Sequence, residues 1–163
     1  MAPLTTWLRA LPVVPMLLAA TAGVAAAQQG EVEIRTFAGK CADVSASSTA
    51  DDVALIQYSC NDQPNQRFDI VQVGPDLVEI RTFAGKCLDV RGASSADLAP
   101  IVQFSCNGQD NQAFRIAGVG SGLVEIRTVS GKCLDVRGAA PADLTPIVQF
   151  SCNGQDNQLF RIV

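Results

Sequence analysis

The stretch Gly-Lys-Cys-Leu-Asp-Val occupies residues 85–90 and recurs unchanged at residues 131–136. A variant with alanine in place of leucine occupies residues 39–44. The interval is a constant 46 residues (85 − 39 and 131 − 85), and residues 77–116 differ from residues 123–162 at 6 of 40 aligned positions. Because a fixed period of this length is the signature of a repeat architecture, the sequence predicts one structural unit present three times.

Each unit carries a β pattern. In the second unit, apolar and polar side chains alternate over residues 78–82, as they do in a half-buried strand. Further short strands are predicted at residues 87–91, 101–106 and 112–116, and turn-rich linkers at residues 73–76 and 118–122. Three copies of four strands give about twelve strands. Three repeats are fewer than the roughly four to eight blades of a propeller. A closed threefold barrel leaves no exposed strand edges, so we expect an all-β closed fold.

Six cysteines recur with the units. They allow 15 disulfide pairings, of which one set stays within each unit and respects the threefold repeat. That set joins Cys41 with Cys60, Cys87 with Cys106, and Cys133 with Cys152. Each bond would stabilise the fold by roughly 3 kcal/mol by restricting the unfolded chain. A cysteine-only metal site would need close Cys-x-x-Cys pairs, which the sequence lacks, so we expect no metal and no other cofactor.

The composition narrows the range of functions. The chain has 163 residues, a net charge of −4 and no histidine, which removes histidine-based catalysis and histidine-ligated metals. An acidic chain is a poor partner for nucleic-acid phosphates and for anionic membranes. Ser59, Ser105 and Ser151 recur beside cysteines without a base to activate them, and one repeated carboxylate per unit does not make the close pair that a glycosidase needs. We therefore expect no enzymatic activity.

The first 27 residues resemble an export signal. Arg9 precedes an apolar run at residues 10–24, and three alanines follow at residues 25–27, as at a signal-peptide cleavage site. A membrane anchor would need roughly 20 uninterrupted apolar residues, whereas prolines interrupt this run. We expect residues 28–163 to be secreted, extracellular or periplasmic, where disulfides persist, with no membrane contact after signal removal. Within them the units are predicted at residues 31–76, 77–122 and 123–163.

A candidate ligand site follows from strand parity. The period of two puts Cys87 and Asp89 on one face of their strand, with Leu88 and Val90 on the other. Phe104 shares a face with Cys106, so antiparallel strands tied by that disulfide would place Asp89 opposite Phe104. An aromatic ring beside a carboxylate suits a sugar, whose C–H face packs on the ring while its hydroxyls donate to the carboxylate.

The three units resemble the ricin B-type (R-type) lectin repeat. The resemblance rests on Gly-Lys-Cys-Leu-Asp-Val, an aromatic residue two positions before the second cysteine, and Asn-Gln-x-aromatic, and it covers residues 28–163. It implies a β-trefoil and a monomeric, non-catalytic carbohydrate-binding module for a galactoside, xylan or another glycan, with up to three shallow sites. The residues that the resemblance assigns to these sites are Asp43, Tyr58, Asn65, Gln66, Asp89, Phe104, Asn111, Gln112, Asp135, Phe150, Asn157 and Gln158.

Several residues keep a second interpretation. The family usually has tryptophan where this chain has Phe68, Phe114 and Phe160, which we interpret as core anchors. The repeated aspartates could be structural acceptors, the asparagines could hold turns, and the glutamines could bond the aspartates from behind. Arg91 and Arg137 fit either a surface ion pair or a ligand contact, and the lysines of the Gly-Lys-Cys motifs are expected to be solvated. The alternative function is a protein-interaction or inhibitor module with vestigial sugar sites.

Overall fold

The computed structural model describes residues 30–163, and the expected signal segment at residues 1–27 lies outside them. The strands of the first unit are β1 (Ile34–Arg35), β2 (Cys41–Val44), β3 (Val53–Tyr58) and β4 (Phe68–Gln72). Those of the second are β5 (Val78–Thr82), β6 (Cys87–Val90), β7 (Ile101–Phe104) and β8 (Phe114–Gly120). Those of the third are β9 (Leu123–Thr128), β10 (Cys133–Val136), β11 (Thr145–Phe150) and β12 (Arg161–Ile162). The described residues therefore form the expected all-β arrangement of three four-stranded units.

Two short 3-10 turns complete each unit. One follows the second strand and the other precedes the fourth. In chain order they are η1 (Ser45–Ser47), η2 (Pro64–Gln66), η3 (Arg91–Ala93), η4 (Asp110–Gln112), η5 (Arg137–Ala139) and η6 (Asp156–Gln158). The middle residue of the first kind of turn has a positive φ, which glycine adopts without strain at Gly92 and Gly138 and which Ala46 adopts at φ 56°.

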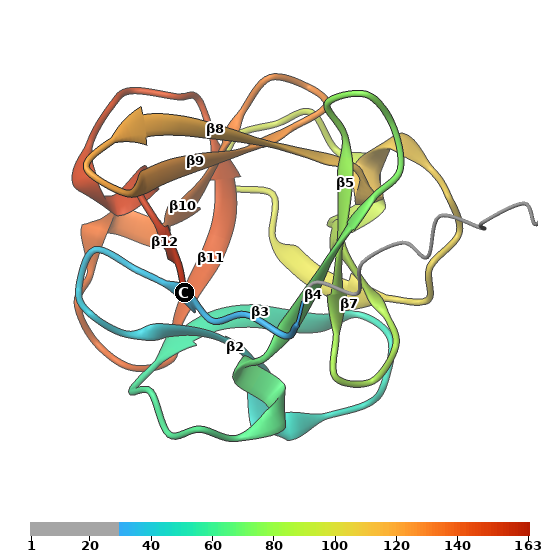
Figure 1. The fold of residues 1–163 in the computed structure, drawn as a ribbon, viewed down its shortest axis with the longest axis horizontal. Helices are drawn as coiled ribbons and strands as arrows, with labels where there is room; N and C mark the ends of the chain where they lie inside the picture. The colour runs from blue at the N-terminus through green and yellow to red at the C-terminus, as the bar shows by residue number, and fades with distance from the viewer. Residues whose placement is uncertain (1–29) are drawn as a thin grey trace, which may run out of the picture.

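Antiparallel pairing closes the units into a ring. The hairpins β4–β5 and β8–β9 join successive units, and β1 pairs with β12 to join the first unit to the last. β3 pairs with both β7 and β11, so the inner hairpins of the three units also meet. Figure 1 shows the three units in successive sectors around one centre, with the C-terminus beside the first strands. This is a β-trefoil, and the closed threefold barrel expected from the sequence is confirmed.

The core is built from the same positions of each unit. Phe68, Phe114 and Phe160, which stand where the lectin family usually has tryptophan, are at most 1% exposed. Aliphatic side chains from every unit pack in the same cluster, among them Ile80, Leu88 and Ile101. The phenylalanines are therefore core anchors, as expected. Within the described residues, the structure has no helix with the length and apolar character of a membrane span.

The disulfides join the cysteines within each unit. Cys41 bonds Cys60, Cys87 bonds Cys106, and Cys133 bonds Cys152, as the repeat predicts. The first cysteine of each pair is fully buried at the start of a strand, whereas the second lies on the exposed segment after the third strand of its unit. Each disulfide thus ties the loop that follows that strand to the core.

Several predicted boundaries are wrong by a few residues. The strands expected at 87–91 and 101–106 end at Val90 and Phe104. The strand expected at 112–116 begins at Phe114, because Gln112 belongs to η4, where its amide groups bond other parts of the unit. The linker expected at 118–122 is largely strand, since β8 continues to Gly120.

Candidate functional site

The repeated aspartate of each unit is a nearly buried carboxylate held by a glutamine. Asp89 lies on β6 with 4% of its surface exposed, and its Oδ2 accepts a hydrogen bond of 2.9 Å from Gln112 Nε2. The equivalent bonds are from Gln66 to Asp43 and from Gln158 to Asp135, each 2.8 Å long. One oxygen of each carboxylate is thereby fixed in position by the protein.

The glutamines position the carboxylate and are themselves closed to solvent. Gln112 is fully buried, accepts a hydrogen bond from the backbone N–H of Asn107, and donates to the carbonyl oxygen of Ser105. Gln66 and Gln158 make the equivalent bonds. All the amide groups of these side chains are engaged within the unit, so the structure gives the three glutamines the supporting role that the sequence left open, behind the aspartate.

The asparagine before each glutamine leaves an acceptor free. Asn111 Nδ2 donates to the carbonyl oxygen of Val90 at 3.2 Å, and Asn65 and Asn157 donate to Val44 and Val136 at 3.1 Å. Within residues 30–163, the buried side-chain polar atoms that lack a hydrogen-bond partner are the Oδ1 atoms of these three asparagines. An unpaired buried acceptor is costly, and its repetition in every unit suits a place where a ligand hydroxyl or a water donates.

Burial changes the acidity of the three aspartates. Loss of hydration raises the pKa of Asp43, Asp89 and Asp135 above the ordinary aspartate value. The side-chain amides of the neighbouring glutamine and asparagine act in the opposite direction, because they favour the charged form. A buried carboxylate kept charged by donors is a strong acceptor for a ligand hydroxyl.

The aromatic ring of each site stands at the end of the neighbouring strand. Tyr58 is 36% exposed, Phe104 is 38% exposed, and Phe150 is half-buried. The expectation that Asp89 faces Phe104 directly is wrong: Asp89 pairs with Val102, and Cys87 pairs with Phe104. The register differs by two residues because Cys106 lies beyond the end of β7. Strand parity still puts Asp89 and Phe104 on one face, as diagonal neighbours.

The carboxylate and the ring line one pocket. In the second unit a pocket of about 400 Å³ is bounded by Asp89, Phe104 and Asn111, with η3 along one side. In the third unit Asp135, Phe150 and Asn157 bound a pocket of about 420 Å³ with η5 in the same place. Asp43, Tyr58 and Asn65 hold the equivalent positions on β2, β3 and η2 of the first unit. The structure thus brings together three of the four residues that the resemblance assigns to each of these two pockets, with the glutamine behind the carboxylate.

Sequence reasoning missed other pocket residues. The second pocket is also lined by Asn107, Gln109 and Asp52, and Asp52 comes from the first unit. The dipeptide Asn107-Gly108 is typical of a turn, and Gly108 has a positive φ of 71°. The repetition of Asn107 and Gln109 as Asn153 and Gln155 is a sequence signal that could have marked them.

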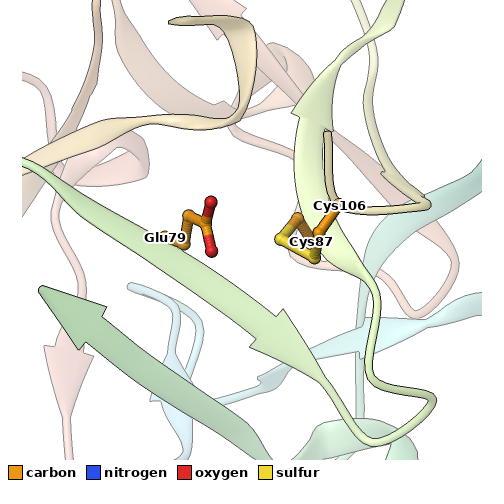
Figure 2. Close-up of side chains that lie close together, drawn as sticks. All are labelled: Glu79, Cys87 and Cys106. Carbon is orange, nitrogen blue, oxygen red and sulfur yellow. A yellow bond between two sulfur atoms is a disulfide. The ribbon is translucent and has the colours of Figure 1, made fainter. Parts of the chain in front are cut away.

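One other group of potential ligand side chains gathers in the described chain. Glu79 lies close to the sulfur atoms of Cys87 and Cys106, as Figure 2 shows. Both sulfurs belong to the disulfide and are not thiolates, so they do not offer the ligands of a zinc site. The Glu79 carboxylate instead accepts hydrogen bonds from Arg81 at 2.8 and 3.1 Å. The group is structural.

The repeated serines occupy an ion-paired environment. Ser105 Oγ donates to Asp51, and Lys86 Nζ donates to Ser105 at 3.2 Å and to Asp51 at 2.6 Å. Lys86 Nζ is therefore the donor in its bonds to both the serine and the aspartate. The same arrangement surrounds Ser59 and Ser151. These serines take part in bonds that join one unit to the next.

Comparisons with known proteins agree with this geometry. The family model of the ricin-type beta-trefoil lectin domain matches residues 28–160. A designed threefold symmetric protein, ThreeFoil, is 36% identical with a TM-score of 0.81, over 82% of this chain and 98% of that one. The exo-beta-1,3-galactanase 1,3Gal43A from Clostridium thermocellum is 28% identical with a TM-score of 0.81, over 84% of this chain and 30% of that one. The chain therefore corresponds to less than a third of the galactanase.

A more distant solved structure shares the fold. The Rhizoctonia solani agglutinin is 17% identical with a TM-score of 0.73, over 82% of this chain and 94% of that one. No curated protein matches the chain. The family match includes residues of all three units and those that bound the second and third pockets, so the chain belongs to the ricin-type β-trefoil lectin domain family.

Proposed function

We propose that this protein is a secreted, non-catalytic carbohydrate-binding protein with up to three shallow sugar sites, one per unit. The observation that carries the proposal is the pairing, in one pocket, of a buried carboxylate fixed by glutamine with a partly exposed aromatic ring. The carboxylate accepts hydrogen bonds from sugar hydroxyls, and the ring packs against the apolar face of the sugar. Membership of the lectin family supports the same function.

The asparagine completes the polar side of the proposed site. Its unpaired Oδ1 accepts a further ligand hydroxyl, while its Nδ2 stays bonded to the backbone. The site then recognises a sugar through at least two acceptors and one apolar face. Because each site makes few contacts, we expect weak binding at each site. Three sites on one rigid fold raise the avidity for a polymeric glycan that reaches more than one of them.

Secretion is supported by the disulfides. The chain has three disulfides, and disulfides form and persist in oxidising compartments such as the extracellular space and the periplasm. The proposal of a cleaved signal at residues 1–27 rests on the sequence pattern. The mass of the purified secreted protein tests it, because cleavage after Ala27 leaves a chain that begins at Gln28.

A binding experiment with two charge-matched variants tests the function. The protein is titrated with a panel that contains galactosides, xylo-oligosaccharides and other neutral glycans. One variant carries Asp43→Asn, Asp89→Asn and Asp135→Asn. Asparagine keeps an acceptor for the glutamine but loses the charge, so we expect the affinity of each site to fall roughly 10- to 100-fold.

The control variant carries Glu31→Gln, Asp69→Asn and Asp76→Asn, which remove the same charge from exposed positions that do not line the second or third pocket. It should bind as the unmodified protein does. Selective binding that is lost only in the pocket variant supports the proposal. If the triple pocket variant does not fold, the single variant Asp89→Asn replaces it. Ligand binding to the second pocket is then followed through the amide signals of that pocket, and a loss of affinity there supports the proposal. Absence of glycan binding by the unmodified protein rejects the proposal in favour of a protein-interaction module.

A further inference from the structure

The second and third pockets are bounded by the same aspartate, aromatic ring and asparagine, but they differ at two residues of the rim. We call these two positions the mouth: residues 91 and 52 in the second pocket, and residues 137 and 98 in the third. In the second unit, Arg91 Nε donates to Asp52 Oδ1 at 2.6 Å, and its Nη2 donates to the backbone oxygen of the same residue. Asp52 belongs to the first unit, so this mouth is formed by an ion pair between two units. Both residues line the second pocket.

The third pocket keeps the arginine and lacks its partner. Arg137 is the equivalent of Arg91 and lines the third pocket, but Leu98 stands where the second pocket has Asp52. Within residues 30–163, the Arg137 guanidinium has no hydrogen bond and no carboxylate within 4.0 Å. At the site of the first unit the two equivalent residues are Ser45 and Leu144, so neither position carries a charge.

Backbone bonds hold the partner position at the mouth in every unit. The N–H of Asp52 donates to the carbonyl oxygen of Gln103, and the N–H of Leu98 donates to that of Gln149. Both residues have a positive φ, 64° for Asp52 and 67° for Leu98. Leucine is unusual in this conformation, and Leu98 remains 49% exposed beside the free guanidinium. The change from aspartate to leucine therefore alters the charge of the mouth without moving the chain.

The electrostatic consequence differs between the two pockets. Asp52 neutralises Arg91, so the charge left in the second pocket is the negative charge of Asp89. In the third pocket the charged residues are Asp135 and Arg137, and the arginine faces solvent with its donors free. A free guanidinium offers a planar pair of N–H groups that matches the two oxygens of a carboxylate or a sulfate.

We propose that the third pocket selects glycans with an anionic group, a carboxylate or a sulfate ester, and that Arg137 is the residue that recognises it. This inference rests on the proposed sugar-binding function and adds selectivity to one of its three sites. Asp135 and Asn157 accept hydrogen bonds from the sugar hydroxyls, and Phe150 packs on the apolar face of the sugar. Arg137 binds the acidic substituent. The second pocket, with its arginine paired, has no such preference.

The two pockets provide their own controls for a test. The full protein is titrated with a galactose oligosaccharide, the matching galacturonic acid oligosaccharide and a sulfated galactoside. Amide signals of Ala139 and Asn157 report the third pocket, and those of Ala93 and Asn111 report the second. The measured quantity is the ratio of acidic to neutral affinity at each pocket. We expect this ratio to be about tenfold higher at the third pocket than at the second, and to fall as salt is added.

Reciprocal variants exchange the two mouths. Leu98→Asp gives Arg137 the partner that Arg91 has, and should bring the ratio at the third pocket down to that of the second. Asp52→Leu frees Arg91 and should raise the ratio at the second pocket. Arg137→Ser reproduces the mouth of the first unit and should abolish the preference without introducing a new charge.

Equal ratios of acidic to neutral affinity at the two pockets would overturn the inference, and so would a ratio at the third pocket that Leu98→Asp leaves unchanged. In either case, binding of the neutral oligosaccharide would still support the sugar-binding function. If neither neutral nor acidic ligands shift any pocket signal, the sugar-binding function itself fails, and the inference fails with it. A preference for the carboxylate alone or the sulfate alone supports the inference and identifies which anion the pocket takes.

Discussion

Lys86 in the second unit lies 2.6 Å from Asp51 in the first, and the same ion pair joins every unit to its neighbour. Lys132 bonds Asp97, and Lys40 in the first unit bonds Asp143 in the last, each at 2.6 Å. The expectation that these lysines are solvated turn residues is wrong. Each aspartate also accepts a hydrogen bond from the backbone N–H of the serine that precedes the second cysteine. The three pairs form a cyclic network that closes only when the first and third units meet.

Replacing Asp51, Asp97 and Asp143 together by asparagine should make folding less sensitive to acid. The hydrogen bond from lysine holds the pKa of each carboxyl below its ordinary value. Their stabilising contribution is therefore present above the unfolded aspartate pKa of about 3.9 and is lost as the pH falls through the lower, folded value. The variant should have a lower urea midpoint than the unmodified protein at pH 7, and the difference should shrink at pH 3. A difference that is constant between the two pH values would contradict this assignment.

Gln103 provides a second, neutral connection between units. Its Nε2 donates to the carbonyl oxygens of Ser48 and Ala50 in the first unit, each at 2.7 Å, and its Oε1 accepts from Thr82 Oγ1. The side chain is fully buried, so Gln103→Leu leaves these partners without a bond. We expect the free energy of unfolding to fall by about 2–4 kcal/mol, measured by urea denaturation.

The same substitution at an exposed glutamine is the control. It distinguishes the effect of losing the Gln103 hydrogen bonds from the effect of replacing a glutamine by leucine. Gln63 is exposed and its side chain makes no hydrogen bond within the described residues. Gln63→Leu should change the free energy of unfolding by less than about 0.5 kcal/mol. Equal effects of Gln63→Leu and Gln103→Leu would show that the bonds across the unit boundary contribute nothing.

The disulfide of the second unit offers a third test. Cys87 and Cys106 are 19 residues apart in the sequence, and their cross-link restricts the unfolded chain. Replacing both by alanine should lower the free energy of unfolding by about 3 kcal/mol. Urea denaturation measures the loss, and an added reductant serves as a control because it should affect the unmodified protein more than the variant. A loss under about 1 kcal/mol would mean that the folded unit does not depend on this bond.

The repeat predicted the fold because each unit contains the same β pattern and cannot bury its apolar face alone. The alternation at Leu88 and Val90 correctly placed these side chains in the core. The register between β6 and β7 could not be predicted from the disulfide, because only Cys87 of the bonded pair lies within a strand. Cys106 instead lies two residues past Phe104, the last residue of β7, so every pairing between β6 and β7 shifts by two.

The family resemblance also predicted three residues that line each of the second and third pockets and lie within one unit, namely the aspartate, the aromatic residue and the asparagine. It could not predict the mouth, because Asp52 and Leu98 reach the pockets of the following units only after the ring has closed. Nor does composition distinguish a paired arginine from a free one. That difference depends on which residue stands 39 positions before the arginine in the chain.

Sugar affinity should fall as the pH is lowered toward the raised pKa of the three pocket aspartates, because these groups then take up protons. Burial raises the pKa of Asp43, Asp89 and Asp135 above the ordinary value of about 3.9, so they take up protons while exposed carboxylates are still charged. A protonated carboxyl is a weaker acceptor for sugar hydroxyls, so binding should decline as the pH approaches the raised pKa from above. Stability changes in the opposite sense: because the folded state binds these protons more readily than the unfolded state, the contribution of the three groups to stability rises as the pH falls through the raised pKa. Titrations of a neutral glycan between pH 7 and pH 4, beside urea midpoints at the same pH values, measure both effects. Affinity that stays constant while the aspartate carboxyl signals titrate would show that the charge of these groups does not contribute to binding.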